Sequence, residues 1–343
     1  MGRITAASVR RRLRGRVVAF LKDTRFCHVI YPAWWRQKLG WRSSNKAVPQ
    51  YFTSIPNPGA GIGHQMANWI AGRWFAQVFG LAFAHIPFAS PRWEEFLGFG
   101  TNEVTVRELV FKHGYRIVRL PLFSEFDQRQ LELIRRMIGV YCGKKIIFVC
   151  EQDQFYRDQF GVIDIVREKF HARHKSSSIE LYKEKVLHIA IHVRRGDIVS
   201  GQTSGNPNLQ MRWQNVDYFD QALRQITAVI PSDIPYLIHL FSQGERSEFS
   251  LFDRFPGMRY HLGSDEMETF LHFAFADILV TSKSSFSYKP ALLSNGIKIC
   301  PRNFWHGYPQ DTDWFLVNDS GDFEKDDLDR FGAELSKRFP SAG

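Results

Sequence analysis

One segment constrains the fold more than any other: residues 186–193, with the sequence VLHIAIHV, run directly into charged residues. Almost every residue in it is apolar or β-branched, which is typical of a parallel strand covered on both faces. Strand patterns recur at 236–241 and 277–281. Helical patterns lie at 216–230, 265–276 and 288–294, with Ser264 as the expected N-cap of the second helix. This alternation predicts an α/β domain built on a parallel sheet.

The first half of the chain opens with the same kind of unit. Residues 51–55 have a strand pattern, residues 58–63 form a glycine-rich loop, and residues 64–79 have a helical pattern. A polar stretch of small residues at 172–178 marks a soft boundary. We therefore predict two Rossmann-like α/β domains facing a cleft. The chain divides into an arm and connector (1–48), an N-terminal domain (49–175), a C-terminal domain (176–320) and a C-terminal helix or tail (321–343).

The net charge of +10 is concentrated at one end of the chain. Residues 1–46 contain twelve Lys and Arg residues and one acid, Asp23, so the other 297 residues together carry about one negative charge. A nucleic-acid-binding protein would spread positive charge over a folded face, so nucleic acid is not expected as a partner. Apolar residues of the arm also fall at helical spacing (Val9, Leu13, Val17, Phe20 and Leu21). The pattern favours either a basic amphipathic helix on an anionic membrane surface or a disordered basic tail.

Hydropathy and cysteine content bear on the compartment. The longest apolar run near the N-terminus, residues 17–21, is too short to span a bilayer or to form the core of a signal peptide. The four cysteines form no C-x-x-C pair and no zinc-ligand spacing, and we expect them to be reduced. We therefore expect a cytoplasmic protein, with peripheral contact at the cytoplasmic face of the membrane as a role for the arm.

The charged residues after the first long strand predict an anion site. Arg194 and Arg195 follow the strand directly, and ligands of open α/β sheets bind at the carboxyl ends of the strands. Arginine binds phosphate with two parallel hydrogen bonds and keeps its charge. Gly196 permits a sharp exit from the strand, and Asp197 can hold a guanidinium or accept a proton. A surface Arg–Asp pair is the alternative interpretation.

Two further segments carry groups that suit phosphate. Residues 277–287 read strand, then Thr, Ser and Lys, then helix, and serine hydroxyls with a helix N-terminus form a phosphate site. Ordinary N-capping by one serine is the alternative. Gly59, Gly61 and Gly63 form a G-x-G-x-G loop rather than the dinucleotide fingerprint, so they indicate either close approach to a ligand or a plain tight turn. Asp311 and Asp313 form a D-x-D pair, but it follows the last strand–helix unit, so we do not expect a metal there.

At these residues the chain resembles a known enzyme family. His192–Asp197, read HVRRGD, matches the H-x-R-R-x-D motif of the α-1,2- and α-1,6-fucosyltransferase superfamily. Residues 61–66 are similar to the family's early G-x-G-N-Q-M/L loop, with His64 in place of Asn. Residues 217–222 resemble its D-Y-Y-x-x-A helix, and residues 276–287 resemble its third motif. The resemblance covers about residues 50–305 and is strongest to the α-1,2 branch, glycosyltransferase family 11.

The resemblance implies a GT-B type enzyme that transfers L-fucose from GDP-β-L-fucose to a glycan hydroxyl with inversion and without a metal or other cofactor. It implies Arg194 and Arg195 as the groups that stabilise the β-phosphate, and Asp197, Glu245 and His64, in that order, as candidates for the base. The implied donor-binding residues are His192, Arg194, Arg195, Ser242, Ser284, Ser285, Phe286, Ser287, Gly61, Gly63, His64 and Gln65.

Two departures from the family pattern leave alternatives open. The family has F-S-D-D where this chain has Phe241–Glu245, read FSQGE, so a carboxylate contact to the nucleotide is missing at that position. Tyr288 and Lys289 replace a pair of tryptophans, which bears on linkage and sugar. A related transferase with another sugar or linkage (α-1,6 or protein O-fucosyl type) is one alternative. A non-catalytic anion-binding or membrane-scaffold protein on the same fold is the other.

Overall fold

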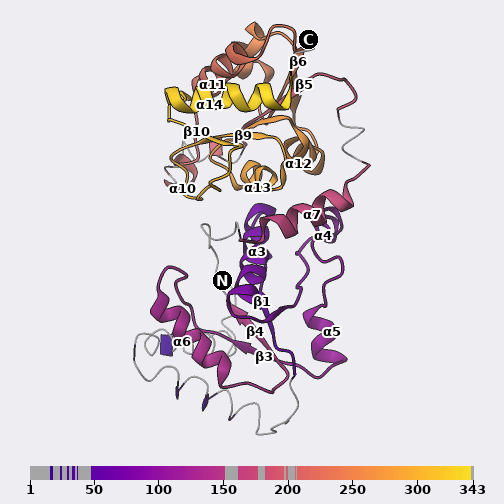
Figure 1. Cartoon of the computed structure of the whole chain (residues 1–343), viewed down its shortest axis with the longest axis vertical. Coiled ribbons are helices and arrows are strands. Elements are labelled where there is room, and N and C mark those ends of the chain that lie inside the picture. Colours follow the sequence, from indigo (N-terminus) through magenta and orange to yellow (C-terminus); the bar gives the residue numbers. More distant parts are fainter. Residues whose placement is uncertain are drawn as a thin grey trace. The chain divides into compact units, whose positions relative to one another are not determined.

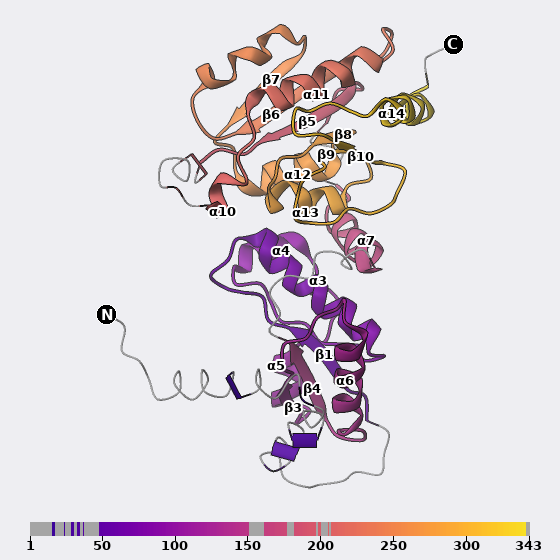
Figure 2. The same cartoon turned by 90° about the vertical axis from the view of Figure 1, so that its left-hand side faces the viewer.

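The computed structural model describes residues 48–150, 161–176, 182–196, 198–199, 205 and 207–340, together with positions 16, 17, 24, 29, 30, 33, 34 and 37. The chain divides into two compact units, residues 1–162 and 163–343 (Figures 1 and 2). The boundary between the units lies just before the helix at residues 163–173, whereas the sequence analysis placed it after residue 175. Most of the basic arm lies outside the described residues. Among the described helices, none combines the length and apolar character that a membrane span requires.

The N-terminal unit is built on a parallel sheet of four strands in the order β2-β1-β4-β3. Strand β4 is buried along its whole length, as a central parallel strand should be. Three of the helices have side-chain caps, at Ser90, Thr105 and Asp127. The elements are β1 (Tyr51–Ser54), α3 (Ile62–Val78), β2 (Ala82–Phe83), α4 (Pro91–Leu97), α5 (Val106–Phe111), β3 (Arg116–Arg119), α6 (Gln128–Gly139) and β4 (Ile146–Cys150).

The C-terminal unit holds a parallel sheet of six strands in the order β10-β9-β8-β5-β6-β7. The first strand of the unit, β5, is therefore central, and the chain reverses direction along the sheet between β5 and β8. The elements are α7 (Ile163–Arg173), β5 (Leu187–Val193), α10 (Pro207–Gln210), α11 (Val216–Val229), β6 (Tyr236–Ser242), the 3₁₀ helix η2 (Arg246–Arg254), β7 (Met258–Leu262), α12 (Glu266–Phe275), β8 (Ile278–Val280), α13 (Ser285–Leu293), β9 (Ile297–Pro301), β10 (Trp314–Val317) and α14 (Lys325–Arg338).

The two faces of the C-terminal sheet bury different chemistry. One face is wholly apolar: Ile189 and Ile191 of β5 pack in one core with aliphatic and phenylalanine side chains of α11, η2 and α14. The other face carries His188 and His192 of β5, and the aromatic side chains of α12 pack against it, with Phe273 5.2 Å from His192 between ring centroids. Helices therefore cover both faces (Figure 2), which explains why β5 is buried at all seven positions.

The prediction of two α/β units with parallel sheets is confirmed. Helix α3 begins at Ile62, two residues before the predicted start, and the starts of α12 and α13 also differ from the sequence analysis. The helix predicted at 265–276 is capped by Asp265, which accepts from the Met267 and Glu268 N–H groups, and not by Ser264. The helix predicted at 288–294 begins three residues earlier, because the Ser284 hydroxyl accepts from the Phe286 N–H and starts it there.

Candidate functional site

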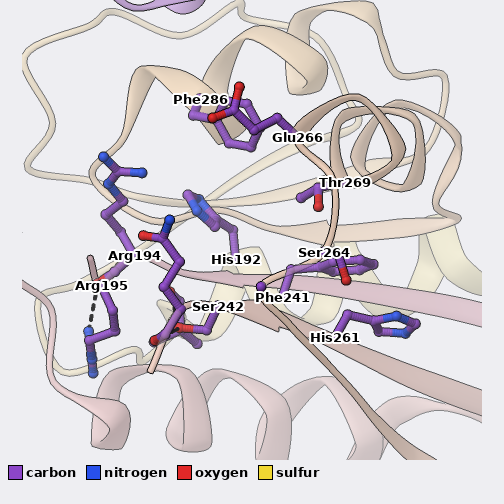
Figure 3. Close-up of a pocket in the computed structure, with 13 residues that line it drawn as sticks. His192, Arg194, Arg195, Phe241, Ser242, His261, Ser264, Glu266, Thr269 and Phe286 are labelled. Carbon is purple, nitrogen blue, oxygen red and sulfur yellow. Dashed lines mark hydrogen bonds between the residues drawn. The ribbon is translucent and has the colours of Figure 1, made fainter. Parts of the chain in front are cut away.

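The candidate site is a pocket of about 250 Å³ at the carboxyl end of the six-stranded sheet. It lies at the ends of β5, β6 and β7 and is closed by the first residues of α12 and by Phe286 of α13 (Figure 3). The point where strand order reverses, between β5 and β8, is where open α/β sheets leave a crevice for ligands. Read from the β7 edge, the order β7-β6-β5-β8-β9-β10 is the strand order of a dinucleotide-binding fold.

Arg194 and Arg195 both line this pocket but face different surroundings. Figure 3 shows their guanidinium groups on opposite sides of the backbone, as expected for neighbours on an extended chain. Arg195 is only 4% exposed, and its Nη1 donates to the carbonyl oxygens of Arg194 (2.8 Å) and Gln214 (3.1 Å). Its guanidinium also lies 4.2 Å from the centre of the Trp213 ring. Arg195 is thus held by the protein, and Arg194 is the arginine with a more accessible guanidinium.

The exit from β5 explains why a glycine follows the arginines. Gly196 has a φ of +64°, which L side chains rarely adopt, and a Cβ there would collide with the Gln243 side chain. Gln243 and Ser242 line the pocket from the end of β6, and the Ser242 hydroxyl donates to the Val193 carbonyl at 2.7 Å. The ends of β5 and β6 are therefore joined by side chains as well as by the sheet. Asp197, a predicted catalytic residue, lies outside the described residues.

His192 is a buried, neutral imidazole in the wall of the pocket. It is 5% exposed, and its Nδ1 lies 2.9 Å from the Ser282 hydroxyl at the end of β8. Burial, and then the charges of Arg194 and Arg195, lower the pKa of His192 to about 3. The ring therefore stays uncharged at neutral pH and can offer one N–H or one lone pair to a ligand.

The predicted serines at the start of α13 are mostly engaged with the protein. Ser284 caps the helix, and the buried Ser287 hydroxyl donates to the Ser284 carbonyl at 3.3 Å. Ser285 lies 3.0 Å from His306 Nε2 through its hydroxyl. Lys283 directs its ammonium group to Asp319 at 3.0 Å, so its charge is already compensated. Of the four predicted α13 residues, Phe286 is the one that lines the pocket.

The wall opposite the arginines was not predicted as part of a site. Ser264, Glu266 and Thr269 line it from the start of α12, and His261 lines it from β7. Their carboxylate, hydroxyl and imidazole groups give this wall of the pocket hydrogen-bond acceptors. The sequence analysis assigned Glu266 to the first turn of a helix, and nothing in the sequence places β7 beside β6. The order of the strands brings these residues into the pocket.

The predicted residues of the glycine-rich loop belong to the other unit. Gly61, Gly63, His64 and Gln65 belong to the N-terminal unit, where Gly61 is the N-cap of α3. Gln65 braces the loop before α3 by donating to the Ala60 carbonyl at 2.9 Å and accepting from the Ala89 N–H at 3.0 Å. Gly61 has an ordinary φ of −62°, so the fold does not require a glycine there.

Two carboxylates considered in the sequence analysis have structural partners. Glu245 and Glu248 form a reciprocal capping box at the start of η2, with the Glu245 N–H 2.8 Å from Glu248 Oε1. Asp313 of the D-x-D pair forms an ion pair with the buried Lys298 of β9. Among the described residues there is no cluster of His, Cys, Asp and Glu that could hold a metal ion.

Comparison with known proteins gives similarity in structure only. No family model matches the chain, and no curated protein matches it. The structure of POFUT1 in complex with GDP is similar at 11% identity and a TM-score of 0.48, over 74% of this chain and 98% of that one. A mutant of Arabidopsis thaliana FUT1 in complex with GDP is similar at 13% identity and a TM-score of 0.41, over 88% and 81%. NodZ alpha-1,6-fucosyltransferase soaked with GDP-fucose is similar at 13% identity and a TM-score of 0.42, over 72% and 93%.

Proposed function

We propose that this protein is a glycosyltransferase that moves L-fucose from GDP-β-L-fucose to a hydroxyl group of a glycan. The observation that carries the proposal is the position of Arg194. It belongs to the H-x-R-R-x-D pattern, lies at the reversal point of a six-stranded parallel sheet, and lines a pocket there. A fixed positive charge at that point suits the diphosphate of a nucleotide sugar.

In the proposed reaction the acceptor oxygen attacks C1 of fucose as the bond from C1 to the β-phosphate oxygen breaks. The bonding electrons leave with GDP, the hydroxyl proton passes to a base or to water, and the configuration at C1 inverts. Negative charge grows on the β-phosphate in the transition state, and preorganised donors aimed at that charge supply the largest rate effect. We assign this role to Arg194, with Arg195 holding its loop. Asp197 remains our first candidate for the base.

We assign the base of the nucleotide to the far wall of the pocket. Guanine presents two adjacent N–H donors, which a carboxylate can accept together, and Glu266 supplies a carboxylate there. Uracil and adenine lack that pair of donors. We propose that Gly61, Gly63, His64 and Gln65 of the N-terminal unit also contribute to donor binding, that the linkage is α-1,2, and that no metal is needed. The α-1,6 and protein O-fucosyl types are the alternatives within this activity.

A thermal-shift comparison of GDP, UDP and ADP tests the nucleotide. A ligand present at 100 times its Kd stabilises the native state by about 2.7 kcal/mol, so GDP should raise the melting temperature and the other two should not. Equal shifts with all three nucleotides would overturn the guanine assignment. GDP-fucose turnover, measured with and without excess chelator, then tests catalysis. GDP binding without hydrolysis or transfer would favour the scaffold alternative, and activity lost with chelator and restored by manganese would overturn metal independence.

A further inference from the structure

We propose that Gln214 is a positioning residue for the donor pocket: it fixes the loop of Arg194 and Arg195 relative to the first turn of α13. The proposal rests on the proposed function, because it concerns the same diphosphate site. Gln214 does not line the pocket and would not touch the donor.

Gln214 belongs to a short segment that crosses the reversal point of the sheet. Three consecutive residues each contact the loop that follows a different strand. The guanidinium of Arg212 lies 5.3 Å from the ring centre of Trp305, which follows β9. Trp213 stacks on Arg195, which follows β5. Gln214 reaches Lys283, which follows β8. The segment therefore connects the carboxyl ends of three adjacent regions of the sheet.

The contacts of Gln214 lie on both sides of the proposed phosphate site. Its backbone carbonyl accepts from Arg195 Nη1 at 3.1 Å, and the same Nη1 donates to the Arg194 carbonyl at 2.8 Å. Its side-chain Oε1 accepts from the Lys283 N–H at 2.7 Å. Gln214 is 7% exposed, so water does not replace these bonds easily. The backbone at Arg194 and the backbone just before Ser284 are thus joined through one residue.

Most backbone donors in and just before the first turn of α13 already have acceptors. The Phe286 N–H is used by the Ser284 hydroxyl, and the Ser287 and Tyr288 N–H groups are used by the Ser284 carbonyl. The Lys283 N–H is used by Gln214. Within the described part of the chain, the Ser285 N–H has no acceptor. An anion held between Arg194 and this N–H depends on their separation, and catalytic constellations tolerate displacements of only about 0.5 Å.

The test compares Gln214→Leu with Gln214→Glu. Leu removes the acceptor for the Lys283 N–H, whereas Glu keeps an oxygen at that place. We expect Leu to weaken GDP binding at least 10-fold in calorimetry and to raise KM for GDP-fucose, with KM for the acceptor unchanged. The tenfold figure for Leu corresponds to the loss of one hydrogen bond. Because Glu keeps that hydrogen bond, we expect the GDP affinity of Gln214→Glu to stay within about threefold of wild type.

Gln225→Leu is the matched control. The Gln225 side chain also bridges two backbone groups, accepting from the Phe323 N–H at 3.1 Å and donating to the Gly321 carbonyl at 3.1 Å, but it does not line the pocket. It should lower the melting temperature and leave GDP affinity unchanged. If Gln214→Leu does not fold, Gln214→Asn, which shortens the side chain, takes its place with the same expected loss.

Wild-type GDP affinity in folded Gln214→Leu or Gln214→Asn would overturn the positioning role while leaving the proposed function intact. Equal loss of affinity in Gln225→Leu would also overturn it, because the effect would then be one of stability. Absence of GDP binding by the wild-type protein would overturn the proposed function and this inference together.

Discussion

Arg194 and Arg195 are neighbours on an extended chain, so their side chains point to opposite sides and meet different groups. Burial disfavours the charge of Arg195 and lowers its pKa, and the two carbonyl oxygens and the Trp213 ring that enclose the guanidinium offset part of that cost. Arg194 has its guanidinium on the other side of the strand end (Figure 3). We therefore propose that Arg194 binds the diphosphate and that Arg195 supports the loop.

Lysine at each position should give two distinct results. Arg194→Lys keeps the charge but loses the two-pronged geometry, so we expect turnover to fall at least about 100-fold with little change in melting temperature. Arg195→Lys cannot reach both carbonyl oxygens or stack as a plane on Trp213, so we expect a stability loss of about 1–3 kcal/mol. Turnover and thermal unfolding of both variants check this. Two variants that both behave like wild type would make the arginine pair a surface feature.

The residues that the sequence analysis could find are those that a short pattern places on a strand end. Arg194, Arg195 and the serines after β8 were identified because strand and loop are adjacent in sequence. Glu266, Thr269 and Gln214 could not be found this way. Their roles depend on which strands are neighbours and on where the connection between β5 and α11 runs, and no local pattern encodes either fact.

At the scale of elements, the strands β5, β6 and β7 share a chain of hydrogen-bonded histidines on the face under α12. His188 Nε2 lies 3.0 Å from the Glu184 carbonyl and must donate to it. A neutral His188 therefore accepts at Nδ1 from His239 Nε2 (3.1 Å), and His239 in turn accepts at Nδ1 from His261 Nε2 (3.0 Å). With His188 neutral, each imidazole of the chain thus has a defined tautomer.

This face should make the C-terminal unit sensitive to acid. Burial, followed by the neighbouring imidazoles, lowers the pKa of His239 to about 3 and that of His272 to about 4. In the unfolded chain these histidines bind a proton near pH 6.5, whereas in the folded chain they do not. The free energy of unfolding is therefore highest above pH 6.5 and falls as the pH drops toward 4. The slope is at most about 1.4 kcal/mol per pH unit for each histidine.

Urea unfolding at pH 7, 6 and 5 measures how the free energy of unfolding depends on pH. These pH values lie above the range in which carboxylates titrate. His272→Gln should show a shallower slope than wild type because it removes one of the histidines whose pKa is lowered by burial. A wild-type stability that is flat from pH 7 to pH 5 would contradict the prediction.

Helices and strands could be predicted where the periodicity of the apolar residues and the length of the segment indicated the same kind of element. Their first and last residues were harder to predict. The strand at 186–193 and the helix at 216–230 match β5 and α11 to within one residue at each end. The start of α13 was missed because Ser282, Ser284, Ser285 and Ser287 all resemble caps. Only the observed bond from the Phe286 N–H to Ser284 identifies the one that starts the helix.

At the scale of the whole molecule, charge is the property that separates the arm from the two folded units. Residues 1–25 contain eight Lys and Arg residues and one acid. We expect removal of these residues to weaken binding to vesicles containing anionic lipid, because each basic residue near such a surface contributes roughly 1 kcal/mol at moderate salt. Vesicle sedimentation measures this, and the thermal shift with GDP should be unchanged as a control. Equal vesicle binding by the truncated and full-length proteins would show that the arm does not act at membranes.

The strand order of the C-terminal unit also has a consequence for how the protein is made. Strand β5 lies between β6 and β8, yet β8 leaves the ribosome 85 residues after Val193. At a synthesis rate of 5–20 residues per second, one edge of the central strand stays unpaired for roughly 4–17 s. During that time VLHIAIHV is an apolar strand edge of the kind that aggregates. A slower ribosome or a truncated chain that ends before β8 would prolong that exposure, so yield during expression should depend on elongation speed.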